Sequence, residues 1–249
     1  MKKIGFFAPA CCGRKTRDGQ EPSPTHHLPL GAGAVTPKAM CIQQSVGYPP
    51  CYLVGARASG KTTMGAVFAQ ALSVALSPKN LPASARPEDF QWCFLDTDDL
   101  LVRAFGESIA DYVAHAGWSA FRQRESQALR AATAAATVLA TGGGCIENPA
   151  NGLFMREHGC VIYLSAPAAV LAERLRAQPL VEQRPTLTGA GVCAEVGTVL
   201  TVRDPLYRAS AHAVLDASQD VAAVLRDMLR AYSTFLAQWA RAEEDTACR

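Results

Sequence analysis

The eight residues from Gly55 to Thr62 constrain this chain more than any other stretch. Their sequence is Gly-Ala-Arg-Ala-Ser-Gly-Lys-Thr, which fits the pattern of a glycine, four residues and then Gly-Lys-Thr. An apolar run, residues 51–54, precedes them, and a helix-like run, residues 64–72, follows. A loop in this setting turns successive backbone N–H groups toward one point, at which the helix also aims its positive end. The segment therefore predicts a phosphate-binding loop.

The side chains of this loop predict how a nucleotide is held. Lys61 is expected to reach the terminal phosphates, and the Thr62 hydroxyl to hold Mg²⁺. The predicted nucleotide-binding residues of the loop are Gly55, Ala58, Ser59, Gly60, Lys61, Thr62 and Thr63.

Composition narrows the class of protein. Hydrophobic residues make up 49% of the 249 residues and charged residues 18%, which is ordinary for a globular protein. The net charge of +2 gives no electrostatic reason to expect nucleic acid or an acidic membrane surface as a partner. No stretch approaches the roughly 18 apolar residues of a membrane span. We expect one α/β domain with tails. Its expected partners are small molecules, and its expected assembly state is a monomer, with a homo-oligomer as the alternative.

The nine cysteines predict reduced thiols and not a disulfide framework, since no CxxC occurs and no histidine lies near them at metal-ligand spacing. Those at 51, 93, 145 and 160 lie in or beside apolar runs, as buried thiols do. Residues 1–11 resemble an export signal, but their apolar run is short and broken by Pro9. A cytoplasmic protein is the expectation.

Apolar runs alternate with helical patterns after a first segment of different character. Residues 1–48 are rich in Pro, Gly, Thr and Ser and are predicted to be a poorly ordered extension of the domain at 49–249. The predicted strands are 51–54, 92–95, 137–140, 160–164 and 213–215. Strands that alternate with helices indicate a parallel sheet covered on both faces. The predicted fold is a P-loop kinase-like three-layer α/β/α sandwich with five parallel strands.

Helical periodicity and its interruptions predict the outer layers. A helix at 61–75 should present Met64, Val67, Phe68, Leu72 and Val74 to the sheet. Two short helical pieces, the second capped by Ser108, and a longer helix from Gly117 to Ala136 should follow. The apolar stripe at about 219–241 predicts a closing amphipathic helix. Residues 178–191 carry Pro, Gly and Arg without an apolar period, which is typical of a mobile lid over a site.

Polar side chains cluster near predicted strand ends. Asp96 and Asp98 close the second strand, and they share a face if the chain remains extended there. Glu125 follows Arg122 by three residues, so the two lie on one helix face, which a surface ion pair would also explain. Three glycines, Gly142–Gly144, follow the third strand, where a plain turn would not require three.

These pieces occur in an order that resembles shikimate kinases over residues 51–217. The matching motifs are the phosphate loop, Asp96-Thr-Asp98, Phe121-Arg122 with Glu125, Ala140-Thr-Gly-Gly-Gly144, Arg184-Pro-Thr-Leu187, and Arg203 with Leu206-Tyr207. The resemblance implies transfer of the γ-phosphoryl of ATP to the 3-hydroxyl of shikimate with Mg²⁺, a step toward chorismate and the aromatic amino acids.

The resemblance also implies residue roles. Arg122 and Arg203 would bind the substrate carboxylate, for which a guanidinium is well shaped. The backbone of Gly142, Gly143 and Gly144 would contact the ring. Asp98 would bind the acceptor hydroxyls and orient or deprotonate the attacking oxygen, and Asp96 would join Thr62 near Mg²⁺. Lys61 and the lid residue Arg184 would offset phosphate charge. Arg174 would lie near the adenine, although a solvated helix residue is an equal alternative.

Two departures and two alternatives remain open at this point. The phosphate loop often has a glycine at the position of Ala58, where alanine adds strain of about 1 kcal/mol if φ must be positive. Arg57 is interpreted as a solvated side chain. A kinase for another hydroxy acid such as gluconate would keep the loop without the Arg122, glycine and Arg203 set. A nucleotide-binding regulatory protein would show erosion at the catalytic positions.

Overall fold

A computed structural model describes residues 47–76, 91–177 and 192–247. Residues 1–46 of the extension predicted at 1–48 lie outside these residues, as does the predicted lid at 178–191 with Arg184. Within the described residues, none of the helices is both long enough and apolar enough to cross a membrane.

The core of the fold is a five-stranded sheet in the order β2-β3-β1-β4-β5, in which every pairing is parallel. The strands are β1 (Cys51–Val54), β2 (Cys93–Asp96), β3 (Thr137–Ala140), β4 (Cys160–Ser165) and β5 (Ala213–Asp216). Alternate residues of β1 enter two different cores: Cys51 and Leu53 pack on one face of the sheet, and Tyr52 and Val54 on the other. The predicted parallel sheet, buried on both faces, is confirmed.

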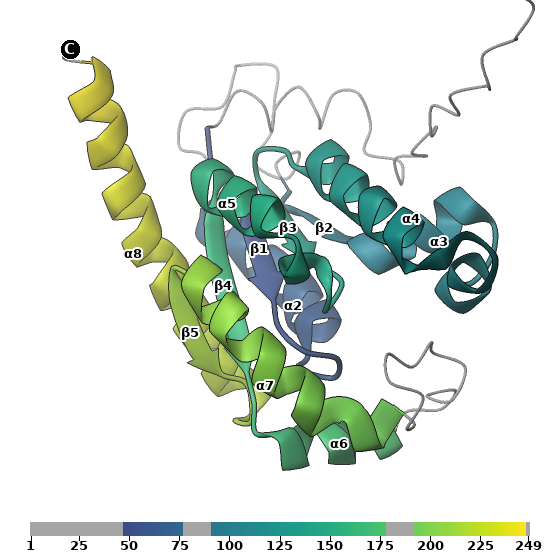
Figure 1. The fold of residues 1–249 in the computed structure, drawn as a ribbon. Helices are drawn as coiled ribbons and strands as arrows, with labels where there is room; N and C mark the ends of the chain where they lie inside the picture. The colour runs from purple at the N-terminus through teal and green to yellow at the C-terminus, as the bar shows by residue number, and fades with distance from the viewer. Residues whose placement is uncertain (1–46, 77–90, 178–191, 248–249) are drawn as a thin grey trace, which may run out of the picture.

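Helices cover both faces of this sheet (Figure 1). On one face, α2 (Lys61–Ala75) and α8 (Val221–Ala247) bury Phe68, Leu72, Met228 and Tyr232. On the other, α4 (Ile109–Ala132), α5 (Pro149–His158) and α7 (Val192–Ser210) contribute Leu129, Met155 and Tyr207. The described residues also form α3 (Thr97–Phe105), the short 3₁₀ turn η2 (Cys145–Glu147) and α6 (Ala168–Arg176).

The structure corrects the predicted helices in two places. Val74 does not face the sheet and is 82% exposed. It lies two residues after Leu72, on the opposite face of α2, whereas Leu76, one turn after Leu72, packs on the core. The helix predicted from Gly117 to Ala136 ends at Ala132, and Ala136 has a positive φ of 50° that a helix cannot accommodate. Gly117, with φ 80° and ψ 163°, marks a kink within α4, close to the predicted helix start.

The carboxyl ends of three neighbouring strands create one functional edge. The phosphate loop follows β1, α3 follows β2, and the glycine triplet follows β3. Since β2, β3 and β1 are adjacent in the sheet, these three segments meet at the edge where open α/β sheets bind ligands.

Candidate active site

The phosphate loop leads into α2 without a side-chain cap. Gly60 caps this helix with φ 93°, no side chain caps it, and no acidic residue lies in its first turn. The Lys61 ammonium donates to the carbonyls of Gly55 and Ala56, both at 2.9 Å, so it lies across the loop. Ser59 Oγ is buried without a hydrogen-bond partner among the described residues. An anion bound here would receive donors that the protein otherwise leaves unused.

Two oxygens beside the loop form a pair suited to Mg²⁺. The Thr62 hydroxyl donates to Asp96 Oδ2 at 2.7 Å, and Asp96 Oδ1 accepts from the backbone N–H of Asp98 at 3.0 Å. Mg²⁺ prefers one or two protein oxygens together with phosphate oxygens and water. The donor set therefore fits the ion. It differs from the predicted geometry in one respect: Asp98 is in α3 and not on an extended strand end, so it does not share a strand face with Asp96.

Ala58 occupies a left-handed backbone conformation, with φ 59°. The strain anticipated for alanine at this position therefore applies. A left-handed alanine costs about 1–2 kcal/mol, and the chain entropy of glycine offsets about 0.5–1 kcal/mol of that.

Replacing Ala58 with glycine should raise the free energy of unfolding by about 0.5–1 kcal/mol. Denaturant unfolding of the two proteins would measure the difference. Ala56→Gly is the matched control, because Ala56 has no positive φ and glycine there should destabilise. A lower stability for Ala58→Gly would contradict the expectation.

A pocket opens on one side of the loop, lined by Ala58, Ser59, Gly60, Thr63 and Arg174 with residues of α8 and the turn after β5. Arg174 Nη2 donates to the Ala217 carbonyl at 2.8 Å, and its Nη1 to that of Ala58 at 3.4 Å. The structure thus places Arg174 beside the phosphate loop. This position is compatible with the predicted contact between Arg174 and the nucleotide.

A second pocket lies on the other side of the loop. Its lining includes all the residues predicted to bind the acceptor: Asp98, Arg122, Gly142, Gly143, Gly144 and Arg203. A Cβ built on Gly143 would lie 3.5 Å from the Gly55 carbonyl oxygen, so the triplet packs directly on the phosphate loop. We refer to this cavity as the acceptor pocket.

Arg122 is held in the acceptor pocket from two sides. Its Nη1 pairs with Glu125 Oε2 at 2.8 Å, and its guanidinium lies 5.2 Å from the centre of the Trp118 ring. The Glu125 side chain is 1% exposed, so the alternative interpretation of this pair as a surface ion pair does not hold. Burial raises the pKa of Glu125 to about 7, although the Arg122 guanidinium lowers it in part. Arg122 is thus positioned by a carboxylate that is costly to ionise.

This raised pKa predicts how stability depends on pH. The folded protein retains a proton on Glu125 that the unfolded chain, with its ordinary pKa of 4.5, has lost. Stability should therefore fall as pH rises from about 4.5 to 7, and this residue's share is about 3 kcal/mol. Comparing urea unfolding of wild type and Glu125→Gln across this range measures that share. Glu157→Gln, an exposed change on α5, should parallel wild type; a Glu125→Gln curve parallel to wild type would contradict the prediction.

The glycine triplet is fixed by neighbouring side chains. The Gly142 N–H donates to Thr97 Oγ1 at 3.0 Å, and the Tyr207 hydroxyl to the Gly143 carbonyl at 2.5 Å. A Cβ on Gly142 would overlap the carboxylates of Asp98 and Glu125, and one on Gly144 would overlap the Arg122 guanidinium. Glycine is thus needed at 142 and 144 to leave room for these side chains, whereas a Cβ at Gly143 would make only ordinary contacts.

Replacing Gly144 with alanine should displace Arg122 and so weaken acceptor binding. Because the obstructed group is the end of a flexible side chain, the fold should remain stable while the KM of the acceptor rises roughly 10-fold, as for the loss of one charged hydrogen bond. Steady-state kinetics would measure the acceptor KM. Gly197→Ala is the control, because a Cβ on Gly197, in α7, would face open space. An unchanged acceptor KM would contradict the expectation that the added methyl group displaces Arg122.

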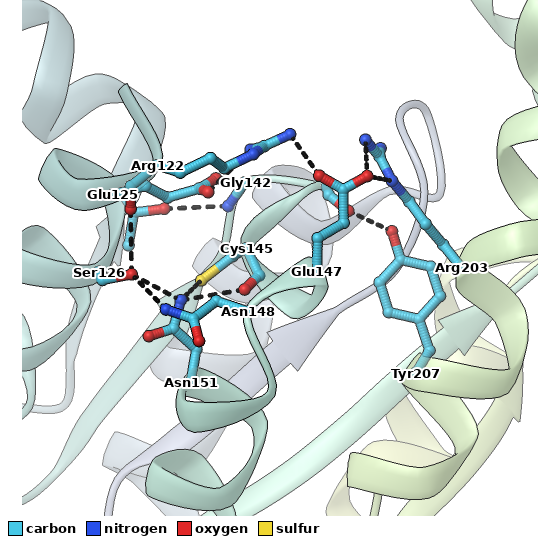
Figure 2. Close-up of polar contacts among 12 residues, drawn as sticks. Arg122, Glu125, Ser126, Gly142, Cys145, Glu147, Asn148, Asn151, Arg203 and Tyr207 are labelled. Carbon is cyan, nitrogen blue, oxygen red and sulfur yellow. Dashed lines mark hydrogen bonds and ion pairs between the residues drawn. The ribbon is translucent and has the colours of Figure 1, made fainter. Parts of the chain in front are cut away.

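The sequence did not predict the contribution of Glu147. Its carboxylate bridges the guanidiniums of Arg122 and Arg203 (Figure 2). In the sequence, Glu147 is an acidic residue three positions after the glycine triplet. This spacing matches no motif from which a role could have been predicted. Arg57 was interpreted as a solvated side chain, but it lines the acceptor pocket.

Comparisons with known proteins agree with this arrangement. A family model described as shikimate kinase matches residues 85–233. Shikimate kinase 2 of Erwinia tasmaniensis is 47% identical over 184 residues, which are 74% of this chain and 95% of the relative. Shikimate kinase of Oleidesulfovibrio alaskensis is 47% identical over 180 residues, 72% of this chain and 94% of the relative.

A solved structure resembles the fold in the same way. Shikimate kinase from Acinetobacter baumannii, in complex with shikimate, superposes with a TM-score of 0.62 at 31% identity, over 74% of this chain and 92% of that chain. Together with the family model and the relatives, this shows that the chain belongs to the shikimate kinase family.

Proposed function

We propose that this protein transfers the γ-phosphoryl group of ATP to the 3-hydroxyl of shikimate, giving shikimate 3-phosphate and ADP. The observation that carries the proposal is the acceptor pocket, in which two guanidiniums and Asp98 lie on glycine backbone that packs against the phosphate loop. Shikimate has one carboxylate and three hydroxyls, and this pocket offers groups for both. Of the solved relatives, the Acinetobacter baumannii protein is one described with shikimate bound.

Each residue has a role in this proposal. Arg122 and Arg203 bind the carboxylate, and Asp98 orients the attacking hydroxyl and takes its proton. Lys61 and the N–H groups of the loop bind the phosphates of ATP. Thr62 and Asp96 would hold Mg²⁺, which when bound offsets the charge of the phosphates. Arg184 would add positive charge from the lid.

Release of ADP in a coupled assay tests the proposal. Purified protein with ATP and Mg²⁺ should form ADP only when shikimate is added. Equal release without shikimate, or a preference for gluconate in a panel of hydroxy acids, would overturn it. We further propose that the protein acts as a monomer on small molecules in the cytoplasm, without nucleic acid or membrane partners.

A further inference from the structure

The chain's own Glu147 carboxylate lies between the two guanidiniums assigned to the substrate. Its Oε2 lies 2.8 Å from Arg122 Nη2, and its Oε1 lies 2.8 Å from Arg203 Nη2 and 2.9 Å from Arg203 Nε. Each carboxylate oxygen thus meets a different guanidinium, which is how an incoming carboxylate would use the same donors (Figure 2).

Glu147 differs from Glu125, the other carboxylate on Arg122. Glu125 is 1% exposed and contacts Nη1, on the side of Arg122 that faces the interior of the protein. Glu147 is 39% exposed and is the last residue of the short turn η2, directly after the glycine triplet. Glu125 therefore belongs to the permanent support of Arg122, whereas the partly exposed Glu147 side chain has solvent beside it into which it can turn.

Departure of Glu147 has to be matched by arrival of another anion. Arg203 has a side chain only 5% exposed, and its Nε and Nη2 both contact Glu147. A buried guanidinium without a counter-ion is strongly unfavourable. Exchange of one carboxylate for another keeps Arg203 paired throughout, so a substrate with a carboxylate can displace Glu147 where a neutral polyol cannot.

We infer that Glu147 is an internal competitor for the acceptor's carboxylate, occupying the Arg122–Arg203 site until a carboxylate-bearing substrate displaces it. The inference rests on the proposed function and extends it. Because a fraction of the protein has its site filled by Glu147, the apparent affinity for the acceptor is lower than the two guanidiniums would give alone. Glu147 is thus a residue that sets acceptor affinity and favours acids over neutral ring alcohols.

Substitution of Glu147 separates this role from a structural one. In Glu147→Gln, which keeps the size of the side chain but removes its charge, the Kd for shikimate should fall by roughly 3- to 30-fold, the range for a partly exposed charged hydrogen bond. The KM for ATP should remain unchanged. Glu147→Asp keeps the charge but is one methylene too short to span both guanidiniums, so its Kd should also fall. Glu157→Gln, an exposed carboxylate of α5 outside the pocket, is the matched control.

Isothermal titration calorimetry with shikimate on the full chain gives these constants, and thermal melting checks that each variant folds. Tighter binding by both Glu147 variants supports the inference. If wild type binds shikimate and Glu147→Gln has an equal or higher Kd, the inference alone is overturned. An Asp variant that binds shikimate like wild type also overturns the inference alone. If neither wild type nor any of the variants binds shikimate, the proposed function and the inference are overturned together.

Discussion

Replacing Asp98 with asparagine should reduce kcat roughly 10²- to 10⁴-fold, the range for loss of a positioned general base. The substitution keeps the size of the side chain, and the N–H of residue 98 can still donate to Asp96 Oδ1 to start α3. Since asparagine cannot accept the proton of the attacking hydroxyl, turnover should suffer far more than binding of ATP. Steady-state kinetics with shikimate and ATP each varied would separate the two.

Asp99 provides the control for this substitution. It lies in the same first turn of α3, carries the same charge and is exposed, outside the acceptor pocket. Asp99→Asn should have kcat and KM values close to those of wild type. If Asp98→Asn retained the kcat of Asp99→Asn, the role proposed for Asp98 would be wrong, and the hydroxyl would have to lose its proton by another route.

The sequence was sufficient to predict the sheet and most of the acceptor pocket, for a physical reason. A parallel strand buried on both faces needs an apolar run, as at Cys160–Leu164, and the residue that follows such a run lies at the binding edge. Asp98, Gly142 and the phosphate loop could therefore be placed together without coordinates. Arg203 is far along the chain from them, and its place in the pocket came from the resemblance.

What the sequence could not predict depends on three-dimensional contacts. The 3₁₀ turn that brings Glu147 between two guanidiniums has no periodicity to reveal it. The positive φ of Ala58 and Ala136 is set by the surrounding backbone, since alanine itself disfavours that conformation. Val74 was assigned to the buried stripe because it is apolar, yet it lies two residues after Leu72 and therefore on the opposite face of the helix.

Replacing Arg122 with lysine should raise the acceptor's KM roughly 10- to 100-fold, as loss of charged hydrogen bonds worth about 1.5–3 kcal/mol implies. The Arg122 guanidinium contacts Glu125 through Nη1 and the Glu147 carboxylate through Nη2 at the same time. A lysine ammonium is a compact point charge that lacks this planar fork, so it cannot hold the buried Glu125 and also present a donor pair to a substrate carboxylate.

Kinetics and a neighbouring arginine make this prediction specific. With the charge retained, kcat at saturating shikimate should change much less than the acceptor KM, because the groups around the transferred phosphoryl are untouched. Arg124→Lys, on the same helix but directed at Gln127, should leave both constants close to wild type. If Arg122→Lys lowered kcat and left the acceptor KM unchanged, Arg122 would act on the reacting phosphoryl, and the carboxylate would have to bind through Arg203 or Arg57, which also line the pocket.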